Sequence, residues 1–73
     1  FEYGAGWGTL HWARRCAQIT SVESSAPWLE RLRPLLPGNA TVLGPLQGLA
    51  YADAARPGGP WDMVIVDGDE RAL

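Results

Sequence analysis

FEYGAGWGTLHWARR, residues 1–15, has glycine at positions 4, 6 and 8, between an apolar segment and a segment with helical periodicity. Residues 1–3 predict the end of a strand and residues 4–8 a loop. Residues 9–17 predict a helix with Leu10, Ala13 and Ala17 on one face. Glycine permits either a tight turn or the close approach of a ligand to the backbone. The stretch therefore predicts a strand, a glycine loop and a helix, and it leaves both reasons for the glycines open.

The rest of the chain continues this alternation of strands and helices. We expect strands at residues 18–23, 40–44 and 63–66, a helix capped by Ser24 or Ser25 that runs to Leu36, and a helix at residues 46–54. The apolar run at 63–66 is typical of a strand that is buried on both faces. Such alternation predicts an α/β, Rossmann-like fold, a parallel sheet with helices on both faces. We expect four strands in the order third, second, first, fourth.

Glycine and acidic residues follow several of the predicted strands. The glycine loop, Glu23 and Asp67-Gly68 all lie at the carboxyl ends of strands, which is the edge where parallel sheets bind ligands. Glu23 comes about 20 residues after Gly4, where an acidic residue can hold ribose hydroxyl groups. Together, the loop and Glu23 predict a ligand that contains ribose. Alone, each has a plainer interpretation, a turn without a ligand and a solvated carboxylate.

The spacing of the glycines narrows the choice of ligand. Dinucleotide-binding loops have the pattern G-x-G-x-x-G, whereas this chain has G-x-G-x-G with Thr9 at the place of the third glycine. The segment EYGAGWG (residues 2–8) resembles the first motif of class I S-adenosylmethionine-dependent methyltransferases. TSVESSAPWLERL (20–32) resembles their second strand and following helix, and WDMVIVDGDERA (61–72) their fourth strand. The resemblance implies that residues 1–73 are a fragment of a single methyltransferase domain, its N-terminal half, which we expect to be inactive alone.

This resemblance implies a binding site for S-adenosyl-L-methionine, formed by Glu2, Gly4, Ala5, Gly6, Glu23 and Ser24. The glycines would line the contact with the ligand, and Ala5 would pack beside it. Glu2 would orient the loop near the methionine end of the cofactor, and Glu23 would hold the ribose. Ser24 would lie beside the adenine, with a helix cap as the alternative.

Adenine recognition and catalysis are assigned to the ends of the third and fourth strands. The family usually has an acidic or amide group after its third strand, but this chain has GPLQG (44–48), in which Gln47, Leu46 or the backbone can serve. Asp67 would be the catalytic residue, facing the sulfonium or the acceptor, or taking a proton from the acceptor. One alternative is a turn in which Asp67 and Asp69 bond to nearby amides. Another is a divalent metal, which some members of the family bind with acidic residues after this strand, but no metal ligand is assigned and the sequence does not decide whether a metal is used.

Two other functions stay open. A nicotinamide-binding oxidoreductase would share the topology and the ribose-binding Glu23, although the glycine spacing disfavours it. A domain that keeps the fold and serves only as an interaction module is the third possibility. The sequence specifies neither the methyl acceptor nor an oligomeric state.

The composition limits partners and location. A net charge of −2 provides no basic face for nucleic acid. Cys16 is a single cysteine, so an internal disulfide cannot form, and we expect a reducing, cytoplasmic environment. No apolar run approaches the roughly 18 residues of a membrane span, and no membrane partner is predicted.

Overall fold

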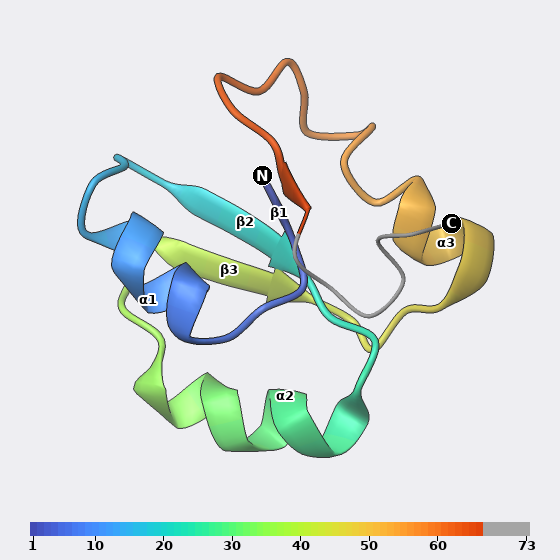
Figure 1. Cartoon of the computed structure of the whole chain (residues 1–73), viewed down its shortest axis with the longest axis horizontal. Helices are drawn as coiled ribbons and strands as arrows, with labels where there is room; N and C mark the ends of the chain where they lie inside the picture. Colours follow the sequence, from blue (N-terminus) through green and yellow to red (C-terminus); the bar gives the residue numbers. More distant parts are fainter. Residues whose placement is uncertain (67–73) are drawn as a thin grey trace.

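Four parallel strands form the sheet, and the computed structural model describes residues 1–66 (Figure 1). The strands are β1 (Glu2–Tyr3), β2 (Ile19–Val22), β3 (Ala40–Leu43) and β4 (Ile65–Val66). They lie in the order β3-β2-β1-β4, which confirms both the predicted order and the predicted direction. In register, Glu2 lies between Ser21 and Ile65, and Ser21 lies beside Val42.

Helices cover both faces of the sheet, as predicted. The helices are α1 (Trp7–Ala13), α2 (Ala26–Leu32), the 3-10 helix η1 (Arg33–Leu35) and α3 (Gly48–Ala52). Successive side chains of a strand point to opposite faces. One apolar cluster joins Val42 to Leu29 and Leu32 of α2, whereas the other joins Val22 to Tyr51 of α3. Figure 1 shows α2 and α3 well separated from each other.

Helix α1 is shorter than the sequence suggests. It ends at Ala13, so the prediction of a helix over residues 9–17 is wrong at its end, and Ala17 is exposed. The reason is a tertiary contact, because the Asn39 side chain donates hydrogen bonds to the carbonyls of Ala13 (2.7 Å) and Cys16 (3.1 Å). Asn39 thereby satisfies carbonyls that the end of a helix leaves without a partner.

Helix α2 begins where expected and ends early. Ser25 is the N-cap, and its side chain accepts a hydrogen bond from the amide of Trp28. The helix changes to η1 after Leu32, before the expected end at Leu36. Pro34 accounts for this difference, because proline has no N–H and cannot continue the hydrogen-bond pattern of an α-helix.

The predicted burial of residues 63–66 on both faces is wrong. Val66 is 52 % exposed because β4 is an edge strand that pairs with β1, and among residues 1–66 no strand pairs with its other edge. In α3, Leu49 is 82 % exposed, whereas Tyr51 is buried against the sheet. The core of the α3 face is therefore aromatic, with the Phe1 ring 5.0 Å from the ring of Tyr3.

The burial difference between two helical leucines can be tested. Leu29→Ala should lower the free energy of unfolding by about 2–5 kcal/mol, because the Leu29 side chain is 2 % exposed and its loss leaves a cavity. Leu49→Ala, the same change at an exposed position, should alter it by less than about 0.5 kcal/mol. Urea denaturation followed by circular dichroism measures both values. Similar losses in the two variants would contradict the burial of Leu29 and the exposure of Leu49.

Candidate functional site

Gly4 turns the chain at the end of β1. Its φ angle of 90° lies in a region that residues with side chains rarely adopt. Its amide donates a 2.9 Å hydrogen bond to the carbonyl of Val22 at the end of β2. The backbone conformation alone therefore explains this glycine.

Glu2 is a buried carboxyl group that connects β1 to β2 and α1. Its Oε1 accepts hydrogen bonds from the hydroxyls of Thr9 (2.5 Å) and Ser21 (2.8 Å). Thr9 Oγ1 also accepts a hydrogen bond of 2.9 Å from the amide of Gly6. Since a buried polar group is costly unless it is hydrogen-bonded, this arrangement fixes the start of α1 against the sheet. A contact between Glu2 and a ligand stays a prediction.

Gly8 makes room for the carboxyl group of Glu2. A Cβ atom at position 8 would lie 2.8 Å from Glu2 Oε2, which is closer than van der Waals contact allows. The Glu2 side chain cannot move away freely, because Thr9 and Ser21 hold its other oxygen. Packing of the side chain of Glu2 thus explains the third glycine of the loop.

Gly6 differs from the other two loop glycines. Its φ of 166° is extended backbone, which any residue adopts. A Cβ atom there would lie 3.5 Å from Cζ2 and 3.6 Å from Nε1 of Trp28, at ordinary van der Waals distance. The described fold therefore does not require glycine at position 6.

Glu23 follows β2 and joins the glycine loop to the start of α2. Its Oε1 accepts a 3.0 Å hydrogen bond from the amide of Ala5, and its Oε2 accepts from the amides of Ser24 (3.0 Å) and Ser25 (2.8 Å). A carboxylate has about four lone-pair sites, so these three bonds leave one site, on Oε1. Glu23 thus lies beside the loop, as the sequence predicts, and it keeps acceptor capacity there.

The end of β3 also reaches Glu23. Gly44 has a φ of 129°, and a Cβ atom on it would collide with the backbone oxygen of Glu23. The same oxygen accepts a 3.0 Å hydrogen bond from the amide of Leu46. The segment that the sequence assigns to adenine recognition therefore lies next to Glu23, with the Leu46 backbone in contact and Gln47 exposed.

Trp28 contacts the glycine loop from α2. Its indole Nε1 donates a 2.7 Å hydrogen bond to the carbonyl of Ala5. Trp28 is only half-buried, whereas its neighbour Leu29 is buried. The N-cap of α2 is Ser25, so the alternative that Ser24 caps this helix is wrong. The position of Ser24 beside the adenine stays a prediction.

Sequence reasoning missed Thr9, Ser21 and Trp28 as partners of the loop. A signal existed for Ser21, because it is a polar residue at the centre of a strand and its predicted neighbour strand carries Glu2. Thr9 occupies the position where a dinucleotide-binding loop has its third glycine. Its hydroxyl accepts a hydrogen bond from the amide of Gly6 and donates one to Glu2. For Trp28, nothing in the sequence indicated the direction of the indole N–H.

Three further expectations concern the catalytic residue, a metal site and a membrane span. Asp67, the predicted catalytic residue, lies outside the described residues, as do Gly68 and Asp69. Within residues 1–66, no group of three or more His, Cys, Asp or Glu side chains is arranged to hold a metal ion. None of the helices in the described part of the chain has the length and apolar composition for a membrane crossing.

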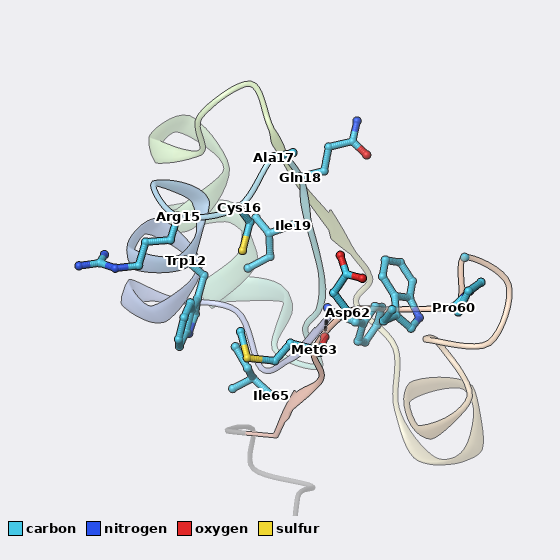
Figure 2. A pocket seen from close by; sticks show the side chains of 13 residues that line it. Trp12, Arg15, Cys16, Ala17, Gln18, Ile19, Pro60, Asp62, Met63 and Ile65 are labelled. Carbon is cyan, nitrogen blue, oxygen red and sulfur yellow. Dashed lines mark hydrogen bonds between the residues drawn. The ribbon is translucent and has the colours of Figure 1, made fainter.

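A surface pocket lies at the opposite, amino-terminal edge of the strands. Figure 2 shows Trp12 and Cys16 on one side of it, and Met63 and Ile65 of the β4 segment on the other. None of the predicted cofactor-binding residues lines this pocket. We place the candidate site at the glycine loop because its backbone is fixed there by the side chains of Glu23 after β2, Thr9 of α1 and Trp28 of α2.

Comparison with known proteins gives no match, either to a family model, to a curated protein or to a solved structure.

The different roles of Gly8 and Gly6 predict different effects of the same substitution. Gly8→Ala should lower the free energy of unfolding by about 1 kcal/mol, because the clash with Glu2 outweighs the better helix propensity of alanine. Gly6→Ala should change it by less than about 1 kcal/mol, because the added methyl group meets Trp28 at ordinary distance. Chemical denaturation measures both values.

A double-mutant cycle identifies the cause of the loss at position 8. Glu2→Asp shortens the side chain and withdraws the carboxyl group from Gly8, so Gly8→Ala should cost less in that background. Additive effects of the two substitutions would show that Glu2 is not what excludes a side chain at position 8.

Proposed function

We propose that this chain binds S-adenosyl-L-methionine at the glycine loop and takes part in methyl transfer to an acceptor. The observation that carries the proposal is the geometry of Gly6. Gly4 is explained by its φ angle and Gly8 by the side chain of Glu2, but the fold does not require glycine at position 6. A ligand that lies against the backbone supplies the missing reason, since any side chain there would obstruct it.

The hydrogen bonds of the loop favour a ligand without phosphate. The amides of Gly4, Ala5 and Gly6 donate to Val22, Glu23 and Thr9 (in that order) within the protein. A pyrophosphate needs free amides that point at it from the start of a helix. Because these three amides are occupied, the loop supports S-adenosylmethionine better than a nicotinamide dinucleotide.

Glu23 supports the ribose contact. Glu23 is 8 % exposed and lies at the carboxyl end of β2. Its Oε1 keeps one acceptor site after it has accepted the hydrogen bond from the amide of Ala5. A ribose hydroxyl group can donate to this site without displacing a bond of the protein. Glu23 would thus hold the ligand and the loop at once.

The chain would contribute mainly by positioning. When bound, S-adenosylmethionine supplies a methyl group on a sulfonium, which is a good leaving group. The glycine loop and Glu23 would hold the ligand so that the acceptor can attack in line, and orientation of this kind lowers a barrier substantially. Asp67, directly after β4 in the sequence, would accept a proton where the acceptor has to lose one.

Substitution of Gly6 tests the proposal directly. In the intact protein, Gly6→Ala should abolish binding of S-adenosylhomocysteine, because the methyl group occupies the ligand's place, while the melting temperature stays nearly unchanged. Gly38→Ala is the control, since a Cβ atom there meets nothing within 4 Å and the residue is far from the loop in the sequence. Calorimetric titration and thermal denaturation of the same samples give both quantities.

Two results would contradict the proposal. One is unchanged affinity in Gly6→Ala, and the other is a loss of binding that only follows a loss of folding. Titration of the wild-type protein with NAD tests the main alternative, and binding of NAD in place of S-adenosylhomocysteine would favour the oxidoreductase.

A graded pair of substitutions tests Glu23. Glu23→Ala should weaken S-adenosylhomocysteine binding by about 1–3 kcal/mol, the usual value for a hydrogen bond to a charged group. It should also lower stability, because the buried amide of Ala5 loses its acceptor. Glu23→Gln keeps one oxygen and should bind with intermediate affinity. Calorimetry well below the melting temperatures separates affinity from folding, and wild-type affinity in both variants would remove Glu23 from the site.

A further inference from the structure

The indole of Trp28 holds a particular peptide group of the glycine loop. Trp28 Nε1 donates to the carbonyl of Ala5 at 2.7 Å. The N–H of the same peptide group belongs to Gly6, and it donates to Thr9 Oγ1 at 2.9 Å. The Ala5–Gly6 peptide is therefore fixed at both ends, from α2 on one side and from α1 on the other.

The ring of Trp28 also bounds the space beside Gly6. Its Nε1 and Cζ2 atoms lie 3.6 and 3.5 Å from the position that a Cβ atom of Gly6 would take. A ligand that contacts Gly6 from this direction therefore meets the edge of the indole. The ring is only half-buried, and it is not part of the buried cluster that Leu29 and Leu32 of the same helix form.

We propose that Trp28 is the positioning residue of the ligand site, which sets the orientation of the Ala5–Gly6 peptide for the adenosyl ligand. This inference rests on the proposed cofactor site. The peptide can rotate only if the bond to Trp28 or the bond to Thr9 breaks, so loss of the indole donor releases the carbonyl of Ala5. The surface that Gly6 presents to the ligand is then no longer fixed before binding. The ligand must order this peptide when it binds, and the cost of ordering it weakens the affinity.

The chain offers a matched control for this residue. Trp61 Nε1 donates a 2.6 Å hydrogen bond to the carbonyl of Ala55, and Trp61 is half-buried like Trp28. Trp28→Phe and Trp61→Phe thus each remove one indole donor from one backbone carbonyl and keep an aromatic ring. Trp61 lines the pocket at the opposite edge of the strands, away from the glycine loop.

The experiment compares the two variants in the intact protein, with S-adenosylhomocysteine as the probe. Both should lose similar amounts of thermal stability. Trp28→Phe should bind about three- to tenfold more weakly than the wild type, the range for loss of one hydrogen bond, whereas Trp61→Phe should bind like the wild type. Equal losses of affinity in the two variants, or unchanged affinity in Trp28→Phe, would overturn the inference.

A measurement without ligand separates this inference from the proposed function. In the ligand-free protein, hydrogen exchange of the Gly6 amide, followed by NMR, should be faster in Trp28→Phe and unchanged in Trp61→Phe. If the wild-type protein does not bind S-adenosylhomocysteine, the proposed function is wrong, and the exchange rate still decides whether Trp28 fixes the peptide. An unchanged rate in Trp28→Phe would overturn that role.

Discussion

The carboxyl group of Glu2 lies inside the protein, where it costs free energy unless hydrogen-bond donors surround it. The hydroxyls of Ser21 on β2 and Thr9 on α1 meet this need, and both can do so only if β1, β2 and α1 take their observed places. The same carboxyl group forbids a side chain at Gly8. Thr9 also accepts a hydrogen bond from the amide of Gly6, so the carboxyl group of Glu2 is connected to the glycine loop through Thr9. The shape of the candidate site thus depends on a polar contact at the start of the first helix.

The sheet could be predicted because its determinants are local. The strands are short runs in which apolar and β-branched residues are frequent, and they alternate with helical segments. This alternation alone indicates a parallel sheet, and the glycine loop marks the reversal of strand order. The ends of α1 and the exposure of Leu49 depend instead on partners distant in the sequence, such as Asn39 for α1. Such partners are visible only after folding. Pro34 is different, because its effect on α2 is local and the sequence contains the signal.

The candidate site shows the same division. The sequence brought Glu23 and the loop together, because both follow strands that are neighbours in the predicted order, and the amide of Ala5 does bind Glu23. In the sequence the three glycines form a single pattern, but in the structure they differ. Gly4 is required by its φ angle and Gly8 by a neighbouring carboxyl group, whereas the fold does not require glycine at position 6. A pattern of residue types cannot separate these causes, since they depend on the φ angle of the residue or on which atoms lie where a Cβ atom would be. The direction of the Trp28 indole could not be predicted for the same reason.

The hydrogen bonds of the loop amides determine which ligand suits the carboxyl ends of the strands. The loop amides at positions 4, 5 and 6 are bound within the protein, so they do not remain for an anion. Acceptor capacity is available beside them, one site on Glu23 Oε1 and the second lone pair of the Ala5 carbonyl, whose first is taken by Trp28. An edge of this kind favours a ligand that brings hydroxyl or ammonium donors and positive charge over one that brings phosphate. S-adenosylmethionine, the ligand that we propose for this site, has ribose hydroxyls, an ammonium group and a sulfonium. The internal bonding of the loop thus adds to the proposal an argument that does not use the spacing of its glycines.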